Sequence, residues 1–207
     1  MKKGIFIVID GIDGSGKTEI VKMLHNYSFT KHKKYHILTT REPTHGIYGK
    51  KVREILKKEK DPKKNGKKLT ELVLKDRKEH LKNSLEPFLK HSNKHERNVV
   101  ICDRYYYSTI AFQGAQGLPI KDLIAKNKPF RKPDIAFILD VEPSKALKRI
   151  EYREKEKFEQ LDFMKKIRKN FLALSKLLDD NIKIINASQP LKNVFENIRK
   201  EVDKILD

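Results

Sequence analysis

The stretch that most constrains the fold is residues 4–18, which read GIFIVIDGIDGSGKT. Residues 5–9 are all apolar and mostly β-branched, and the run is too short for a helix. It therefore predicts a strand that is buried on both faces of a sheet. Residues 11–18 then match the phosphate-loop pattern G-x-x-x-x-G-K-[ST], and an amphipathic helix is expected to follow. Strand, glycine-rich loop and helix together predict a nucleotide-binding phosphate-loop protein.

The residue types in this loop suit phosphate chemistry. Glycines let the backbone turn tightly and bring its N–H groups against phosphate oxygens. Lys17 is expected to reach the β and γ phosphates, and the Thr18 hydroxyl to bind Mg²⁺. ATP and Mg²⁺ are thus the expected cofactors. The expected ATP-binding residues of the loop are Gly11, Ile12, Asp13, Gly14, Ser15, Gly16, Lys17 and Thr18.

Length and composition limit the number of domains, the kinds of partner and the location that the protein can have. A chain of 207 residues suits one α/β domain spanning 1–207. The net charge of +19 suggests polyanionic partners, and both nucleotides and nucleic acids qualify. There is no apolar run of membrane-spanning length and no signal-peptide pattern, so a cytoplasmic protein is expected. The single cysteine, Cys102, lies in an apolar run and is expected to be a core residue.

Apolar patterns along the rest of the chain alternate between strand and helix. Further strands are expected over 36–40, 98–103, 134–141 and 182–187. Helices are expected over 16–27, around 52–56, over 69–89 and 105–116, from Pro143 onward, over 164–178 and over 191–206. Residues 57–68 are charge-dense and are expected to form a solvated loop. This alternation predicts a doubly wound, mostly parallel sheet of five strands with helices on both faces.

Four charged residues stand out in that framework. Arg41 precedes Glu42-Pro43 and is expected at the end of a strand, facing a cleft. Asp103 closes a buried strand, where a carboxylate can hold Mg²⁺ or its waters beside the phosphates. Asp76 and Arg77 interrupt an apolar helical stripe. They are either a structural ion pair or the lining of a polar pocket, and we favour the pocket.

Several motifs together resemble the thymidylate kinase family, and the resemblance extends over essentially the whole chain. They are FIVIDGIDGSGKT, TREPT, the Asp76-Arg77 pair, ICDRYYYSTIAFQG, the KFE around Phe158, and NASQP near the end. The phosphate loop alone would indicate only an NTPase, whereas the combination is specific among nucleotide kinases. The resemblance implies transfer of the γ-phosphoryl group of ATP to dTMP in thymidine nucleotide biosynthesis, and a homodimer.

The resemblance also implies roles on the dTMP side. Arg41 and Arg104 look like the pair that grips the dTMP phosphate, a task that suits the planar fork of arginine. Asp13 looks like the carboxylate that receives the 3′-OH, and Phe112 like the aromatic that crowds the 2′ position. Arg77 corresponds to the arginine at the thymine edge. The implied dTMP-binding set is Asp13, Arg41, Val73, Arg77, Arg104, Ser108, Thr109, Phe112 and Gln113.

On the ATP side, Arg149 resembles the residue that lies against adenine, and Ala187-Ser188 the loop beside it. Thr18 and Asp103 are the implied metal residues, with Asp10 a weaker candidate. The implied catalytic residues are Lys17, Asp13, Arg104 and Arg153. Because the protein has little covalent work in phosphoryl transfer, these residues are expected to position the substrates and neutralise charge.

Two departures from the family pattern change the expectations. Val73 stands where the family usually has a phenylalanine stacked on thymine, so base recognition is expected to be looser or supplied elsewhere. Gly14 stands where some members carry a basic residue. The catalytic cation is then expected from a short lid over about 149–157, with Arg153 the first choice and Lys157 the second.

Two other functions stay open on sequence grounds. Val73 keeps open a broader deoxynucleoside-monophosphate kinase, or a deoxynucleoside kinase, of the same fold. The charge of +19 motivates a nucleic-acid-binding phosphate-loop ATPase. Against that ATPase, there is no basic helix with interleaved aromatic residues, so no nucleic-acid partner is expected. No membrane is expected either, because no apolar run is long enough to span one.

Overall fold

The computed structural model describes residues 4–31, 34–58, 61, 64–92, 96–150 and 161–206. Its strands form one five-stranded sheet in the order β2-β3-β1-β4-β5, and every neighbouring pair is parallel. The predicted strands are confirmed, and the sheet is wholly rather than mostly parallel. The strands are β1 (Ile5–Gly11), β2 (Tyr35–Arg41), β3 (Arg97–Asp103), β4 (Ile135–Asp140) and β5 (Ile182–Asn186).

Strand β1 lies at the centre of the sheet, and all of its residues are buried. It pairs with β3 on one side and with β4 on the other. The register places Asp103 opposite both Ile9 on β1 and Arg41 on β2. The carboxyl ends of β1, β2 and β3 therefore meet at one edge, which is where α/β proteins of this kind bind ligands.

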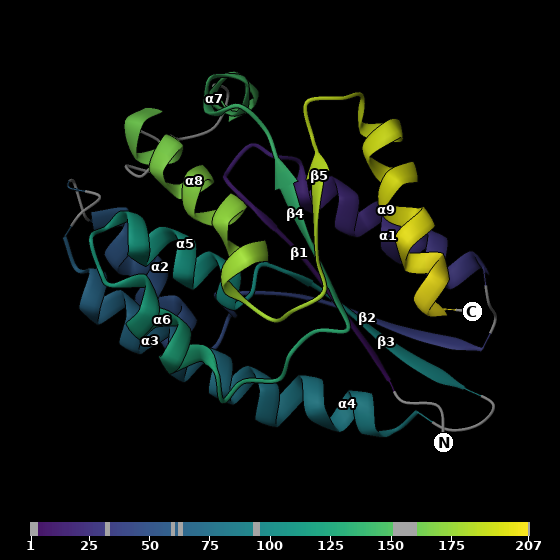
Figure 1. Ribbon diagram of the computed structural model, residues 1–207. Coiled ribbons are helices and arrows are strands. Elements are labelled where there is room, and N and C mark those ends of the chain that lie inside the picture. Colours follow the sequence, from purple (N-terminus) through teal and green to yellow (C-terminus); the bar gives the residue numbers. More distant parts are fainter. Residues whose placement is uncertain are drawn as a thin grey trace.

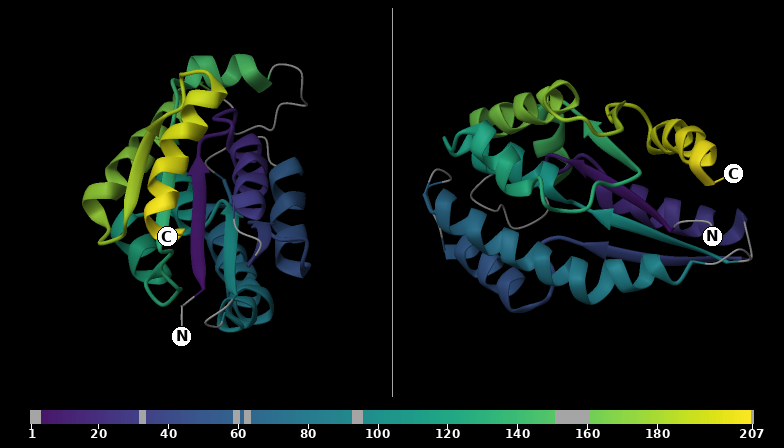
Figure 2. Two further views of the ribbon diagram at one scale, coloured as in Figure 1. Left: turned by 90° about the vertical axis from the view of Figure 1, so that its right-hand side faces the viewer. Right: turned by 60° about the horizontal axis from the view of Figure 1, so that its bottom comes forward.

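Helices cover both faces of the sheet, as predicted (Figure 1). Helices α1 and α9 pack together on one face, and α4, α5 and α8 contact the strands from the other (Figure 2). The helical segments are α1 (Lys17–Lys31), α2 (Ile47–Lys58), α3 (Gly66–His80), a π-helical turn (Leu81–Leu85), α4 (Glu86–Lys90), α5 (Tyr106–Ala115), α6 (Ile120–Asn127), α7 (Pro143–Ile150), α8 (Leu161–Leu177) and α9 (Leu191–Leu206).

The structure corrects the sequence prediction in three places. The charged loop expected over 57–68 is shorter, because α2 continues to Lys58 and α3 already begins at Gly66. Lysine is a good helix former, so charge density alone does not mark a loop. The single helix expected over 69–89 contains a π-helical turn between α3 and α4. Helix α6 was not predicted; its eight residues carry too short an apolar pattern to stand out.

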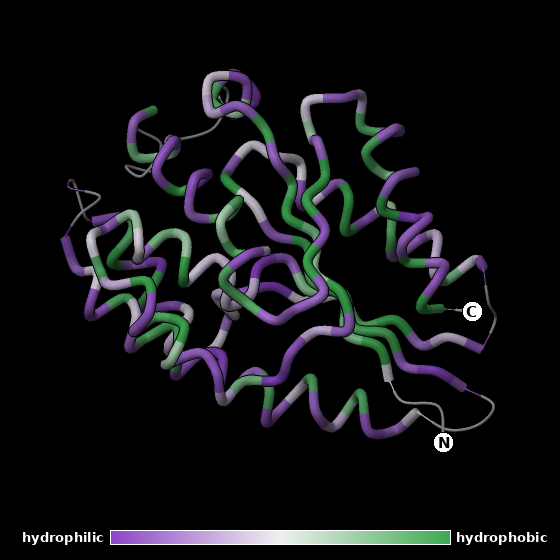
Figure 3. The backbone as a smooth tube through the Cα atoms, viewed as in Figure 1, coloured by the Kyte–Doolittle hydropathy of each residue, from purple (hydrophilic) through white to green (hydrophobic). Residues whose placement is uncertain are grey.

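The core follows the central strands, which form the apolar centre of the tube in Figure 3. Cys102 is fully buried there, as expected of a core residue. Tyr105, Tyr106 and Tyr107 are also buried, so this triplet packs in the interior. None of the helices in the described ranges has both the length and the apolar character needed to cross a membrane.

Helix α9 attaches the end of the chain to its beginning. The Phe195 ring packs edge-on against Tyr27 of α1, with ring centroids 5.9 Å apart. The Tyr27 hydroxyl donates to the Asp203 carboxylate at 2.5 Å. The Leu206 carbonyl accepts hydrogen bonds from the Tyr35 hydroxyl at 2.6 Å and from Arg97 at 2.8 Å. These contacts fix α9 against α1 and the β2–β3 edge.

Candidate active site

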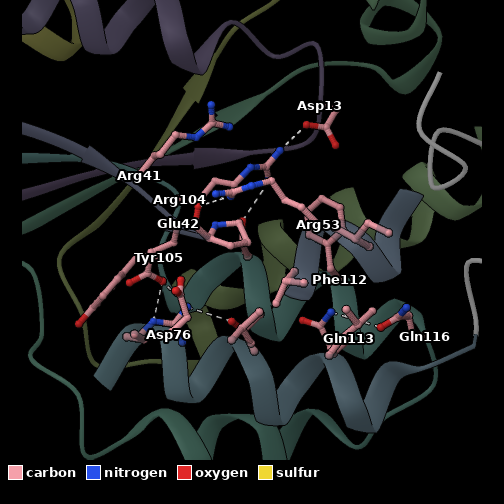
Figure 4. Close-up of a pocket in the computed structure, with 18 of the residues that line it drawn as sticks. Asp13, Arg41, Glu42, Arg53, Asp76, Arg104, Tyr105, Phe112, Gln113 and Gln116 are labelled. Atoms are coloured by element: carbon pink, nitrogen blue, oxygen red, sulfur yellow. Dashed lines mark hydrogen bonds and ion pairs between the residues drawn. The ribbon is translucent and has the colours of Figure 1, made fainter. Parts of the chain in front are cut away.

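A cavity of about 350 Å³ opens at the carboxyl edge of the sheet, a size suited to a small ligand. Elements from across the chain form its walls, including the phosphate loop, β2, α2, α3 and α5 (Figure 4). All of the residues expected to bind dTMP line it: Asp13, Arg41, Val73, Arg77, Arg104, Ser108, Thr109, Phe112 and Gln113. The structure therefore brings this whole set together.

The phosphate loop passes directly from β1 into α1, which begins at Lys17. Gly14 and Gly16 have φ angles of 74° and 95°, which glycine adopts without strain. The Lys17 ammonium donates to the carbonyls of Gly11 at 3.1 Å and Ile12 at 2.8 Å. Burial, and then repulsion from Arg104, lowers the pKa of Lys17 to about 8. Its charge is thus held inside the loop, beside the helix N-terminus that favours anions.

Asp13 and Arg104 form an ion pair at the mouth of the loop (Figure 4). Burial alone would raise the pKa of Asp13, but the charges of Arg104, Lys17 and Arg41 lower it below its ordinary value. Arg41 lies at the same end of the cavity, and its guanidinium makes no hydrogen bond or ion pair with any described residue. Two guanidinium groups thus stand beside the phosphate loop, one of them available to an anion.

Asp103 lies next to Thr18, whose hydroxyl donates to Asp103 Oδ2 at 3.2 Å. The other carboxylate oxygen, Oδ1, is buried and has no hydrogen-bond partner among the described residues, and the same holds for the Ser15 hydroxyl. Buried polar atoms are rarely left unpaired unless a ligand, ion or water satisfies them. Both unpaired atoms adjoin the phosphate loop, which fits a bound phosphate and metal.

Asp10 does not fit the metal role that was its weaker assignment. Its carboxylate is fully buried and accepts four hydrogen bonds. They come from Gly11 N at 2.8 Å, Tyr105 N at 3.1 Å, Ser108 N at 2.9 Å and Ser108 Oγ at 2.7 Å. Because a carboxylate offers about four acceptor sites, none is left for a cation. Burial raises the pKa of Asp10, although Arg104 and the hydrogen bonds from the Ser108 hydroxyl and Gly11 N oppose the shift.

Arg77 belongs to a buried polar network beneath the cavity. Its Nη2 lies 2.7 Å from the Glu42 carboxylate, and its Nε donates to the same oxygen at 2.9 Å. Asn127 and Thr109 accept its other hydrogen bonds at 2.6 and 3.0 Å. The second Glu42 oxygen lies 3.1 Å from His80 Nδ1. The guanidinium is held in one orientation while its residue still lines the cavity.

Asp76, by contrast, does not pair with Arg77. Its carboxylate accepts hydrogen bonds from the backbone N–H of Thr44 at 2.7 Å and from the Thr44 hydroxyl at 2.6 Å. Asp76 and Arg77 both line the cavity, in agreement with the polar-pocket interpretation. Each of them anchors a different residue of the segment that follows β2.

Arg149 contacts both the phosphate loop and the loop after β5, two segments expected to bind ATP. Its Nη1 donates to the Gly14 carbonyl at 3.3 Å and its Nη2 to the Ala187 carbonyl at 3.1 Å. The end of α7 is thereby joined to the phosphate loop and to the loop that follows β5. The residues assigned to ATP lie together on this side of the sheet edge.

Comparison with known proteins bears on this site. The family model described as thymidylate kinase matches residues 9–198. The chain is 36% identical to a probable thymidylate kinase of Pyrococcus horikoshii, covering 95% of this chain and 94% of that one. It is 35% identical to a thymidylate kinase of Clostridium novyi over 96% and 98% of the two chains. A probable thymidylate kinase of Methanococcus maripaludis is 40% identical over 98% and 97%.

The chain belongs to the thymidylate kinase family. Within that family, Gly14 gains a structural explanation here. A Cβ atom at Gly14 would lie 2.3 Å from the Ala146 carbonyl oxygen of α7. A basic side chain at this position would therefore displace α7 or distort the loop. The expected lid residues, Arg153 and Lys157, and Phe158 of the KFE motif lie outside the described residues.

Several residues of this candidate site were not predicted from the sequence. Arg53 of α2 lines the cavity and donates to the carbonyls of Pro43, at 2.6 Å, and Thr44. Gln116 lines the far end, where it accepts a hydrogen bond from Gln113 at 3.2 Å (Figure 4). Glu42 and His80 complete the network around Arg77. In the sequence these are isolated polar residues, and only the arginine buried in an apolar stripe indicated that it needed a partner.

Proposed function

We propose that the protein transfers the γ-phosphoryl group of ATP to dTMP, giving dTDP and ADP. The observation that carries this proposal is one cavity in which Asp13 and Gly14 of the phosphate loop lie together with Arg41, Arg104 and the other residues expected to bind dTMP. The loop would hold ATP, and the two arginines would hold the acceptor phosphate. An acceptor that is already a phosphate oxyanion needs no general base, so positioning and charge neutralisation suffice.

A phosphotransfer panel with Mg-ATP tests the proposal. The acceptors are dTMP, dUMP, dGMP, UMP and thymidine, and turnover without acceptor and with single-stranded DNA serves as the control. We expect the highest kcat/KM for dTMP and a low value for UMP, because Phe112 should crowd a 2′-hydroxyl. Preference for thymidine over dTMP would contradict the acceptor assignment and indicate a nucleoside kinase. Stimulation by DNA alone would indicate an ATPase.

We assign Mg²⁺ to Thr18 and Asp103. The described residues contain no group of three or more His, Cys, Asp or Glu side chains able to hold a metal. Mg²⁺ does not require one, because it commonly binds one or two protein ligands together with waters and substrate phosphates. The unpaired Oδ1 of Asp103 and the neighbouring Thr18 hydroxyl suit that pattern. Held by these two residues, the ion would neutralise negative charge on the phosphates during transfer.

We further assign the catalytic cation to the lid, with Arg153 the first choice. The phosphate loop supplies only Lys17, and the approach of α7 to Gly14 leaves no room for a basic side chain there. Arg153→Met is expected to lower kcat about a hundredfold, by analogy with supplied arginine fingers, and to change dTMP affinity only a few-fold. Steady-state kinetics and dTMP titration of Arg153→Met and Lys157→Met decide between the two residues. Wild-type kcat in both variants would contradict the assignment.

Val73 should set how selective the pocket is for the acceptor base. It lines the cavity and lies only partly buried. We expect Val73→Phe to tighten dTMP binding more than dGMP binding, because base–aromatic stacking contributes about 1–3 kcal/mol in nucleic-acid proteins. Titration of both nucleotides with wild type and variant measures the difference. An equal loss for both would mean that the side chain packs internally and does not face the base.

The remaining assignments follow the family pattern and belong to this proposal. They are a single kinase domain over 1–207 with a lid over about 149–157, a homodimeric assembly and a cytoplasmic location. Arg149 and Ala187 would flank adenine, while Thr109 and Gln113 would lie near the base and sugar. Size-exclusion chromatography with light scattering tests the assembly independently of activity.

A further inference from the structure

Asp10 is a buried carboxylate for which the proposed mechanism has no use. It lies between the last apolar residues of β1 and the first glycine of the phosphate loop. An ionised group this deeply buried is costly unless hydrogen bonds satisfy it. Three of its four hydrogen bonds come from the segment just after Arg104, which is more than 90 positions away in the sequence. Asp10 therefore connects the ATP-binding loop to the start of α5.

Two of those hydrogen bonds are made at the N-terminus of α5, one by the residue before the helix and one by a residue of its first turn. The first N–H groups of a helix have no partner within the helix. Tyr105 precedes α5, and its own side chain makes no capping hydrogen bond. Asp10 Oδ2 instead accepts from Tyr105 N and Ser108 N, so the helix is capped by a residue of strand β1. A carboxylate also suits the positive end of the helix dipole.

The remaining contact leads to the arginine. The Ser108 hydroxyl donates to Asp10 Oδ1 at 2.7 Å and accepts from Arg104 Nη1 at 3.1 Å. Arg104 itself has a φ of 70°, which is uncommon for a residue other than glycine, and its N–H donates to the Ile9 carbonyl at 2.9 Å. Its backbone and its guanidinium are thus both held by residues at the end of β1, directly or through Ser108.

We propose that Asp10 and Ser108 are positioning residues that hold the Arg104 guanidinium where the acceptor phosphate binds. This rests on the proposed function, in which Arg104 grips the phosphate of dTMP. The consequence is specific: loss of either residue should weaken recognition of the phosphate and leave recognition of the nucleoside intact. A purely structural cap would not discriminate between the two.

The test compares the affinities of dTMP and thymidine by calorimetry, in Asp10→Asn, Ser108→Ala and Ser108→Thr. Hydrogen bonds to charged groups correspond to roughly 10- to 100-fold in affinity. We expect Asp10→Asn and Ser108→Ala to lose about that much for dTMP and less than about twofold for thymidine. Ser108→Thr keeps the hydroxyl and should restore most of the dTMP affinity. Asp180→Asn is the matched control, since Asp180 accepts hydrogen bonds from Tyr106 and Tyr107 of α5 but does not line the cavity.

A double-mutant cycle separates positioning from general stability. In an Arg104→Ala background, Ser108→Ala should have no further effect on dTMP affinity, because the residue through which it acts is gone. If Asp10→Asn does not fold, this cycle still decides the proposal. Additive effects, or an equal loss for dTMP and thymidine, would overturn it. Wild type that binds dTMP no better than thymidine would instead overturn the proposed function, so the two failures are distinguishable.

Discussion

Lys17→Met is expected to lower kcat roughly a hundred- to a thousandfold with little change in the fold, because loss of a charge that stabilises the transition state typically costs about 3–4 kcal/mol. The Lys17 ammonium contacts only carbonyls of its own loop and lies 4.0 Å from Asp13. Among the described residues, this ammonium donates no hydrogen bond to any helix or strand other than the end of β1, where the loop starts. Steady-state kinetics and circular dichroism measure the two effects.

The matched control for Lys17 is Lys22→Met on the same helix. Lys22 is exposed and pairs only with Glu19, so this variant should keep wild-type kcat. A Lys17→Met protein that unfolds, or one that keeps near-normal kcat, would contradict the assignment of Lys17 to the phosphates.

The same substitution has a consequence for the pH dependence of stability. Because the pKa of Lys17 is lowered to about 8, the unfolded chain binds this proton more tightly than the folded protein does. Its contribution to stability therefore rises with pH between about 8 and 10.5 and is least favourable below pH 8. We expect the melting temperature of Lys17→Met to equal or exceed that of wild type at pH 7. The advantage should shrink toward pH 10.5. A constant difference across this range would mean that Lys17 is not buried as described.

The second large effect is expected from Arg77→Met, which should destabilise the fold by about 3–5 kcal/mol. The reason is that Glu42, which is only 4% exposed, would keep its buried charge without the Arg77 guanidinium that pairs with it. Chemical denaturation measures the change in the free energy of unfolding. The control is Lys165→Met, because Lys165 and Asp162 are an exposed pair whose loss should cost less than about 1 kcal/mol.

The double variant Arg77→Met/Glu42→Gln identifies the cause. Removing both charges leaves a neutral side chain in place of the carboxylate, so the double variant should be more stable than Arg77→Met alone. The Glu42→Gln single variant completes the comparison. If the stability losses of Arg77→Met and Glu42→Gln simply add in the double variant, the cost comes from packing around Arg77 and not from the unpaired charge. Arg77 also packs near the rings of Tyr105 and Phe130, at 5.0 and 5.4 Å, so some packing cost is expected in every variant.

Most of the fold could be predicted from the sequence, because a parallel sheet with both faces covered requires short, wholly apolar runs. Residues 5–9 and 99–102 are such runs, and each proved to lie in a strand next to the site. The helices next to charged segments were less predictable. Lysine is compatible with both helix and loop, so the sequence pattern gave no reason to place the start of α3 at Gly66 rather than Leu69.

The residues of the candidate site also differ in how far the sequence predicts them. Residues inside contiguous motifs, such as Lys17 and Arg104, could be found because the motif fixes their spacing and their place at the end of a strand. Arg53 and His80 could not, because neither lies in a motif and each contacts the segment that begins with Glu42, which the fold brings beside its helix. Asp10 shows the limit most clearly. The family resemblance made it a weaker metal candidate, whereas its hydrogen bonds with Tyr105 and Ser108 depend on how β1 and α5 come together in three dimensions.

The attachment of α9 to α1 also matters while the chain is being synthesised. Tyr27 and Asp203 are 176 positions apart, which corresponds to roughly 9–35 s of translation at about 5–20 residues per second. During that interval the face of α1 that α9 will cover has no partner from the end of the chain. A ribosome that stalls before α9 emerges would therefore release a product that already carries its phosphate loop but still exposes this face. Chaperones and proteases could reach this face of α1 in such a product.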